Sequence, residues 1–243
     1  MLARRGCAVL CAYLRIEAEA HPGTPDEYRS SRRADAQAVV AAIVDGGGRA
    51  VGVEQNLGDP TAAVRLFDAA EEAFGPVDIL VNNASGWVAD TFTPAHVDRH
   101  GRALRPVSAA TWRQQFAVDT MAPALLIGEL ARRNAARGAR WGRIVGLTSG
   151  GPQGFPQEVS YGAAKAAQNN YTMAAATELA YLGITANMVQ PPVTDTGWIT
   201  ESVRQYVADS GTHLATPDQV AEVVGFLVSD EAALVSGNVI MLR

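Results

Sequence analysis

Short apolar runs alternate with longer stretches of helical periodicity along nearly the whole chain. The apolar runs predict strands at residues 7–13, 50–53, 77–81, 143–147, 184–189 and 238–242. Between them, the pattern predicts helices at 34–44, 61–74, 109–137 and 160–182, and a last helix opened by Thr216 with a proline in its first turn. This alternation indicates an α/β fold, a doubly wound parallel sheet with helices on both faces.

The length of 243 residues fits one α/β domain, so we interpret residues 1–243 as a single unit. In such a sheet, ligands bind at the carboxyl ends of the strands, and functional residues should therefore follow strands directly. The glycines at 46–48 instead follow a helix and precede a strand. We interpret them as a helix terminator rather than as a phosphate loop.

Composition and charge narrow the range of partners. Hydrophobic residues make up 48% of the chain, charged residues 19%, and the net charge of -5 offers no broad basic surface for nucleic acid. Cys7 and Cys11 are too few for a disulfide framework, and no Cys/His cluster has zinc spacing. No apolar stretch approaches the roughly 20 residues that span a bilayer, and the first residues lack a signal-peptide core. We expect a cytoplasmic protein with buried strand thiols and no membrane or nucleic-acid partner.

Two segments that follow predicted strands carry candidate chemistry. Asn82-Asn83-Ala84-Ser85-Gly86 follows the strand at 77–81, and its small residues would let the backbone approach a ligand. An Asx turn that simply ends the strand explains the same residues equally well. Ser149 follows the strand at 143–147, and Tyr161 and Lys165 lie four residues apart on one face of the next helix.

These three residue types suit proton transfer to a carbonyl or alcohol oxygen. A free tyrosine has a pKa near 10, about three units too high for a base at neutral pH. The Lys165 ammonium, and the positive ring of an oxidised nicotinamide, would stabilise the phenolate and lower that pKa. Tyr161 could then exchange a proton with substrate while hydride moves to or from the cofactor, and Ser149 would hold the substrate oxygen. A buried tyrosine beside a snorkelling lysine is the structural alternative.

The motif 82–85, the set Ser149, Tyr161 and Lys165, and the run 187–198 together resemble the short-chain dehydrogenase/reductase family. The resemblance covers essentially the whole chain and is strongest to 3-oxoacyl-acyl-carrier-protein-reductase-like members. It implies a single Rossmann-type domain that forms a homodimer or homotetramer through its two long helices, and a small-molecule carbonyl or alcohol as substrate.

The resemblance also implies roles for individual residues. Tyr161 and Lys165 would contact the nicotinamide ribose, and the segment from about 194 to 211 would form a substrate lid. The other expected cofactor contacts are Asn82 and Ala84 at the adenosine ribose, and Pro191, Val193 and Thr196 at the carboxamide end.

One departure from the family is large. Most members begin with a strand, a T-G-x-x-x-G-x-G loop and a helix that receives the pyrophosphate, and this sequence shows none of them. The first strand and the phosphate loop are thus missing from the Rossmann-type sheet, which would be N-terminally incomplete. The neighbours of that central strand would lose their hydrogen-bonding partner. We expect a mis-set start codon, with a genuinely short product as the alternative.

Smaller departures affect the catalytic set. Asp119 stands where the family has an asparagine that supports a proton-relay water, and its charge would raise the pKa of Tyr161. Pro192 replaces the usual glycine after Pro191. The spacing from Ser149 to Tyr161 is one residue shorter than is common, so Thr148 is an alternative for the role of the serine.

The cofactor is predicted to be NADP(H) rather than NAD(H). An acidic residue after the second family strand would bind the ribose hydroxyls of NAD, and the stretch 12–15 contains none. Arg15 is the candidate partner for a 2′-phosphate. Asn56 and Leu57 stand where the family contacts adenine.

Two insertions interrupt the pattern. Residues 16–33 predict a solvated loop rather than a nucleic-acid arm. Residues 87–106 predict a substrate-side loop, because His96 and His100 would share a face for a metal only if they were helical. The sequence thus predicts a metal-free NAD(P)(H)-dependent oxidoreductase with Tyr161 as general acid/base. The alternative is a non-catalytic paralogue that acts as a partner subunit or ligand sensor.

Overall fold

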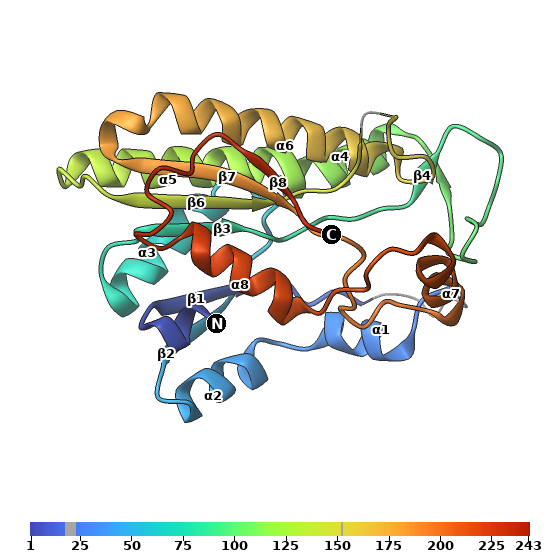
Figure 1. Cartoon of the computed structure of the whole chain (residues 1–243), viewed down its shortest axis with the longest axis horizontal. Helices are drawn as coiled ribbons and strands as arrows, with labels where there is room; N and C mark the ends of the chain where they lie inside the picture. Colours follow the sequence, from blue (N-terminus) through green and yellow to red (C-terminus); the bar gives the residue numbers. More distant parts are fainter. Residues whose placement is uncertain (18–22, 152) are drawn as a thin grey trace.

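The computed structural model describes residues 1–17, 23–151 and 153–243, and most of them lie in strands and helices (Figure 1). The strands, in chain order, are β1 (Ala8–Tyr13), β2 (Arg49–Glu54), β3 (Ile79–Asn82), β4 (Asp90–Thr91), β5 (Arg105–Pro106), β6 (Gly142–Leu147), β7 (Ile184–Gln190) and β8 (Val239–Met241). The helices are α1 (Asp26–Arg33), α2 (Gln37–Asp45), α3 (Ala62–Phe74), α4 (Ala109–Phe116), α5 (Ala122–Ala136), α6 (Val159–Glu178), α7 (Glu201–Ser210) and α8 (Pro217–Leu227). Single turns flank them at Leu2–Arg5, Ala117–Met121 and Ala180–Leu182.

The main strands are all parallel, as the sequence predicts, but they form two separate sheets. One sheet has the order β3-β6-β7-β8, and the other pairs β1 with β2. Among the described residues, β1 and β3 do not pair with each other, so each has an open edge. This agrees with the expectation that the neighbours of the central family strand lack their partner.

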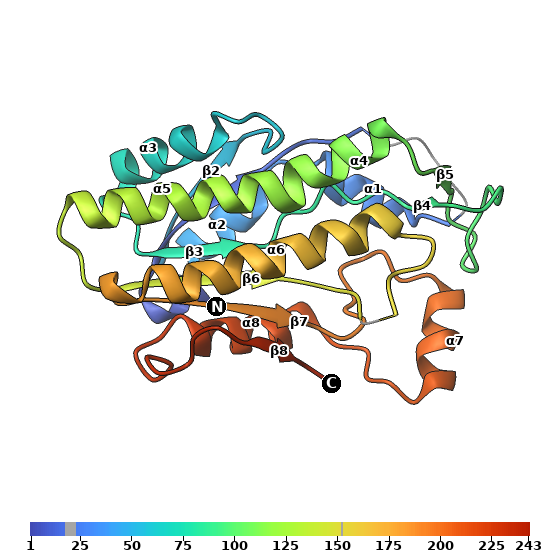
Figure 2. The same cartoon turned by 90° about the horizontal axis from the view of Figure 1, so that it is seen from above.

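Two apolar cores lie on the two faces of the larger sheet. In β6, Ile144 joins the core formed with α3, α5 and α6, whereas Val145 joins the core formed with α8. Both side chains are almost completely buried, as strand alternation requires. Seen from above, α5 and α6 run side by side over the sheet (Figure 2). The domain is therefore three-layered, and the helices hold the strand ends at fixed positions.

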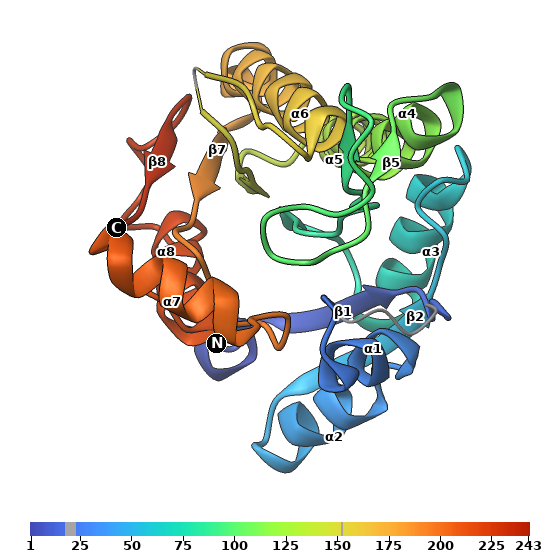
Figure 3. The same ribbon diagram turned by 90° about the vertical axis from the view of Figure 1, so that its right-hand side faces the viewer.

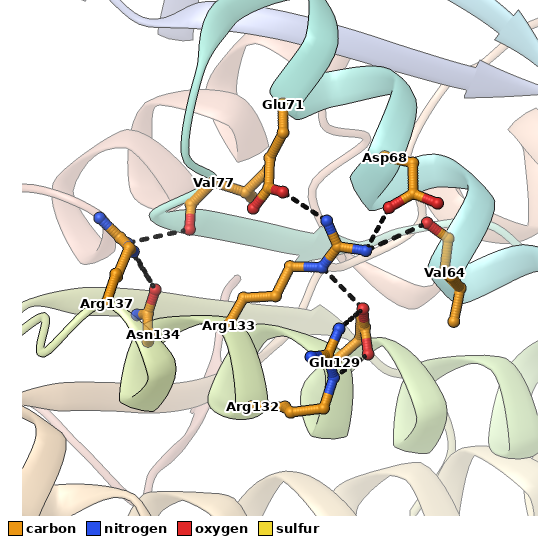
Figure 4. A network of polar contacts seen from close by, with 9 residues as sticks. All are labelled: Val64, Asp68, Glu71, Val77, Glu129, Arg132, Arg133, Asn134 and Arg137. Atoms are coloured by element: carbon orange, nitrogen blue, oxygen red, sulfur yellow. Dashed lines mark hydrogen bonds and ion pairs between the residues drawn. The ribbon is translucent and has the colours of Figure 1, made fainter.

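Helices α3 and α5 are also joined by a network of charged side chains at the surface (Figure 4). Arg133 of α5 binds Asp68 at 2.5 Å, Glu129 at 2.6 Å and, more closely, Glu71. Arg132 binds the same Glu129 carboxylate at 2.5 Å. These contacts fix the relative position of the two helices that cover one face of both sheets.

The predicted helix at 109–137 is interrupted. A π turn at Ala117–Met121 separates α4 from α5, and it contains Asp119. Pro123 explains the interruption, because proline has no backbone N–H for the carbonyl four residues earlier, that of Asp119. Proline inside the predicted helix was the sequence signal for this break.

Two expectations need correction. The insertion at 16–33, of which residues 18–22 lie outside the described ranges, contains helix α1 rather than only loop. Acidic residues in its first turn and arginines in its last complement the helix dipole, which stabilises an otherwise polar helix. Cys7 and Cys11 are half-buried rather than buried. The segment with His96 and His100 is not helical, so the condition for a shared metal-binding face is not met.

Candidate active site

The carboxyl ends of β3, β6 and β7 lie together at the end of the sheet that Figure 3 turns toward the viewer, beside α7. A cavity of about 2000 Å³ opens there, and its wall includes Ser149, Tyr161 and Lys165. It extends past Val81 to Val9 of β1. The structure thus brings the predicted catalytic side chains, which come from two elements, into one cavity.

Tyr161 is held among apolar and hydroxyl groups near the start of α6. The Ser149 side chain acts on its hydroxyl in the sense that lowers the pKa, and the Phe155 ring packs against its ring edge with centroids 5.6 Å apart. Gly162 permits this approach, because a Cβ there would lie 2.5 Å from Phe155. Thr148, the alternative to Ser149, is buried, and its hydroxyl has no partner among the described residues. The geometry therefore favours Ser149 over Thr148 as the hydroxyl next to Tyr161.

Lys165 lies one turn further along α6, with its side chain only 3% exposed. Its ammonium donates to the Leu147 carbonyl at 2.9 Å and to Gln168 Oε1 at 3.0 Å, and it faces Asp119 Oδ1 at 3.0 Å. The same nitrogen lies 5.7 Å from the centre of the Tyr161 ring. Two of the three N–H groups of the ammonium therefore have hydrogen-bond acceptors, and the third faces Asp119 Oδ1, which is at ion-pair distance but accepts no hydrogen bond from the described residues.

Asp119 is completely buried behind Lys165. Its Oδ2 accepts hydrogen bonds from Gln115 Nε2 at 2.6 Å, from the Gly86 N–H at 2.8 Å and from Ser85 Oγ at 3.2 Å. Buried carboxylates are tolerated where donors and a counter-charge surround them, as here. The π turn and the end of the 82–86 segment jointly form this pocket, which sequence reasoning did not foresee.

The two ends of the expected cofactor site differ in where the structure places their residues. Pro191, Val193 and Thr196 line the cavity together with Tyr161 and Lys165. The expected residues away from the cavity wall are Arg15, Asn56, Leu57, Asn82 and Ala84. From the 82–86 segment, Asn83 and Ser85 line the wall instead. In a turn after a strand, side chains alternate in direction, and sequence alone did not fix which pair faces inward.

Arg15, the candidate partner of a 2′-phosphate, lies at the surface after β1. Its guanidinium binds the carboxylate of Glu54, with the shortest contact at 2.6 Å. This contact raises the pKa of Arg15 and lowers the pKa of Glu54, in each case chiefly through their side-chain hydrogen bonds. Nearby, Asn56 Oδ1 accepts from the Gly58 N–H at 2.8 Å, and Leu57 packs against the core. A phosphate at Arg15 would compete with Glu54.

Residues of the insertion 87–106 and of the segment 194–211 line another part of the cavity, with aromatic and charged groups. The Arg102 guanidinium lies over the rings of Trp87, at 5.2 Å, and Trp198, at 5.7 Å. It also binds Asp98 and Glu158, each at 2.6 Å. Burial raises the pKa of Glu158, against the opposing charge of Arg102. Sequence reasoning predicted a substrate-side loop here but missed Arg102 and Glu158. The only sequence signal for Glu158 was its position three residues before Tyr161.

The residues present fit the nicotinamide end of a dinucleotide cofactor. The cavity exceeds the roughly 300–1,000 Å³ of ordinary ligand pockets, and its wall joins the catalytic side chains to the strand ends that the fold uses for ligands. Thr148 Oγ1 and Asn169 Oδ1 belong to residues of the cavity wall and have no partner among the described residues, so polar groups there are available for a ligand or water.

Comparison with known proteins identifies the family. Residues 28–242 match the family model described as enoyl-(acyl carrier protein) reductase. The chain is 33% identical over 212 residues to cis-4-hydroxycyclohexanecarboxylate dehydrogenase of Sinomonas cyclohexanicum, which covers 83% of this chain and 78% of the relative. It is 30% identical over 210 residues to the 3-oxoacyl-acyl-carrier-protein reductase of Synechocystis, which covers 84% and 78%.

A solved structure, the angucycline C-6 ketoreductase LanV with bound NADP, superposes with a TM-score of 0.78 at 25% identity, and covers 99% of this chain and 86% of its own. The fold, the catalytic set and these likenesses agree. The chain belongs to the short-chain dehydrogenase/reductase family and is an oxidoreductase. Its sheet is the parallel Rossmann-type sheet of that family. No helix in the described ranges is both long and apolar enough to cross a membrane.

Proposed function

We propose that this protein reduces a carbonyl group, or oxidises the corresponding alcohol, with Tyr161 as the general acid/base. The observation that carries the proposal is the convergence of Tyr161, Ser149 and Lys165 on one cavity wall. A nicotinamide cofactor supplies or accepts the hydride when it is bound. Ser149 holds the substrate oxygen beside Tyr161, and Tyr161 exchanges the proton with that oxygen.

NADP(H) is the cofactor that we propose. Support comes from Arg15 after β1, from the lack of an acidic residue in the stretch 12–15, and from the NADP in the structure of LanV. The ion pair between Arg15 and Glu54 weakens this preference, because the guanidinium already has an anionic partner. Lys165 would contact the cofactor ribose only by giving up one of its present acceptors.

The substrate that we propose is a carbonyl compound with an apolar body. Aromatic rings from the insertion and the lid line the outer cavity, and they suit an apolar surface. The rings from these two segments belong to Trp87, Phe92, Trp198 and Tyr206, and Phe155 adds a further ring. A 3-oxoacyl thioester and a cyclic ketone both have this chemistry, and the names of the two relatives make them the first compounds to assay.

The decisive experiment is Tyr161→Phe, assayed with NADPH and a 3-oxoacyl thioester or a cyclic ketone. Loss of the proton donor should lower kcat by about 10²–10⁴-fold, while the circular-dichroism spectrum stays unchanged. Titration of the variant with NADPH and NADH, followed by cofactor fluorescence, should still show binding. Turnover retained in this variant would refute the proposed role of Tyr161. Absence of cofactor binding in the wild-type protein would favour the non-catalytic alternative.

We further propose a homodimer or homotetramer built through the long helices. Trp112 of α4, Leu125 of α5 and Tyr171 of α6 are exposed on their outer faces. Exposed aromatic and aliphatic side chains on adjacent helices suit an interface between copies. Light scattering should give a mass at least twice 25.6 kDa, and Trp112→Glu should lower it. A monomeric wild-type protein would contradict this.

A further inference from the structure

The carboxylate of Asp119 has a specific place next to the proton-transfer group. Its Oδ2 takes three donors from the protein, and its Oδ1, which has no hydrogen-bond partner among the described residues, lies 3.0 Å from the Lys165 ammonium. An amide at this position would satisfy the three donors with its oxygen and turn its NH₂ group toward Lys165, where two donors would face each other. The pocket therefore fits a carboxylate better than an amide.

The pairing changes what Lys165 does for Tyr161. A free ammonium 5.7 Å from the ring would stabilise a phenolate, but here a carboxylate 3.0 Å from the same nitrogen offsets its charge. The ion pair is almost completely buried, so solvent screens it little. The electrostatic support for an ionised Tyr161 is correspondingly small.

We propose that Asp119 is a positioning residue that, through Lys165, keeps Tyr161 protonated across neutral and mildly alkaline pH and so adapts the site to carbonyl reduction. The inference rests on the proposed function of Tyr161. In reduction, hydride from the dihydronicotinamide forms the new C–H bond. The electron pair of the C=O π bond takes the proton of the Tyr161 hydroxyl. The products are the alcohol, the oxidised cofactor and a phenolate, which regains a proton from water.

The groups around Tyr161 also favour its protonated form. Its pKa is raised, with burial as the largest cause and the negative charges of Asp119 and Glu158 next; the Ser149 side chain acts in the opposite sense. Among the described residues, the charged and titratable groups that act on Tyr161 are Asp119 from the π turn, Glu158 and Lys165 from the start and body of α6, and Tyr28 from α1. Glu158 is ion-paired with Arg102 at 2.6 Å, which partly offsets its charge. Asp119 is therefore the carboxylate to test.

The first experiment measures pH–rate profiles of the holoenzyme in both directions, for wild type and Asp119→Asn. Alcohol oxidation needs the phenolate, and reduction needs the phenol. The variant should therefore shift the midpoints of both profiles down by about one pH unit or more. The midpoints of the oxidation and reduction profiles should shift in the same direction, because a catalyst leaves the overall equilibrium unchanged. At pH values below the wild-type midpoint, the oxidation rate of Asp119→Asn, as a fraction of its plateau rate, should be about tenfold that of the wild type.

Two further variants separate charge from structure. Asp119→Glu keeps the negative charge and should return the midpoints toward the wild-type values. Glu129→Gln removes another buried carboxylate, on α5 and outside the cavity wall, and should leave the profiles unchanged. Equal profiles for wild type and Asp119→Asn would overturn the proposal.

A second experiment needs no cofactor and no variant at position 119. The chain, with ¹³C at the tyrosine Cζ, is titrated with alkali and followed by NMR, and Tyr161→Phe assigns the signal among the 6 tyrosines. The wild-type Tyr161 signal should titrate above the usual pKa of about 10. A midpoint at or below 10 would overturn the proposal even if Asp119→Asn does not fold. Turnover retained in Tyr161→Phe would instead remove the proposed function, so the two failures are distinguishable.

Discussion

Two groups of charged side chains in this protein make ion pairs of similar length but differ in their exposure to solvent. At the surface between α3 and α5, Arg133 is shared by Asp68, Glu71 and Glu129 (Figure 4). In the cavity wall, Lys165 meets one carboxylate, Asp119. The contacts have similar lengths, but Asp68 is 63% exposed whereas Asp119 is not exposed at all.

The difference shows what burial does to an ion pair. In the network between α3 and α5, water reaches Asp68 and part of Glu71 although Glu129 is only 8% exposed, and several carboxylates share one guanidinium. In the interior, each charge depends on its partner, so removal of either one is costly and changes the proton affinity of the neighbouring groups. The surface network serves to join two helices, and the buried pair serves to set the chemistry of Tyr161.

The largest expected effect is that of Lys165→Met. The variant leaves Asp119 buried without a counter-charge, which should lower the free energy of unfolding by about 3–5 kcal/mol and abolish turnover. Urea unfolding followed by circular dichroism measures the loss. In the double variant with Asp119→Asn, part of the stability should return, because the unpaired charge is gone. A loss below about 1 kcal/mol in the free energy of unfolding of Lys165→Met would contradict this, because exposed ion pairs have effects of that size.

Arg133→Met should have a smaller effect. It leaves three carboxylates close together without their shared cation, and we expect a loss of about 1–2 kcal/mol in the free energy of unfolding. The pH–rate profile should be the same as that of the wild type, because Arg133 lies outside the cavity wall. Arg132→Met is the matched control: its side chain is 62% exposed, and its loss should be smaller. A shift in the pH–rate profile of Arg133→Met would contradict the separation of the two groups.

Acid should weaken the surface network in a defined pH range. Hydrogen bonds from Arg132, with further contacts from Arg133, lower the pKa of Glu129 from 4.5 to about 2. Because the folded-state pKa is lower than the unfolded one, this stabilisation is complete above pH 4.5 and is lost as the pH falls toward 2. It should amount to about 1–2 kcal/mol after solvent screening. Urea midpoints at pH 6, 4 and 3 should decline less steeply for Glu129→Gln, and parallel declines would contradict this.

The smallest effect concerns the exposed pair of Arg15 and Glu54. Glu54→Gln frees Arg15 from its carboxylate, and NADPH should then bind about two- to fivefold more tightly, with little change for NADH. Fluorescence titration of both cofactors measures the difference, and Arg15→Gln should remove it. Equal changes for the two cofactors would show that Arg15 does not contact the 2′-phosphate.

Much of the fold could be predicted because its signals are local. Apolar runs such as that at 143–147 and the threonine cap at Thr216 mark elements within a few residues of their observed ends. The π turn was missed because the apolar periodicity of 109–137 continues through it, although Pro123 marked the place. Helix α1 was missed because it buries no residue, so it carries no apolar stripe.

The meeting of Tyr161, Lys165 and Ser149 at one cavity could also be predicted, since Tyr161 and Lys165 lie one helical turn apart and Ser149 follows the preceding strand. The partners of these residues could not. Whether Arg15 is free or bound to Glu54, and whether Asn82 or Asn83 faces the cavity, depends on strand pairing and on the direction of side chains in a turn. Neither leaves a periodic signal in the sequence.

The sequence by itself determined the order of strands and helices, the parallel sheet and the nearness of Ser149, Tyr161 and Lys165 to one another, because each depends on neighbours close along the chain. It also indicated that Asp119 would act on Tyr161. Only the tertiary structure decided how: the π turn places the Asp119 carboxylate against Lys165 and encloses it away from water. The strength of a charge–charge interaction depends on distance and burial, and both are set by packing between segments far apart in the chain.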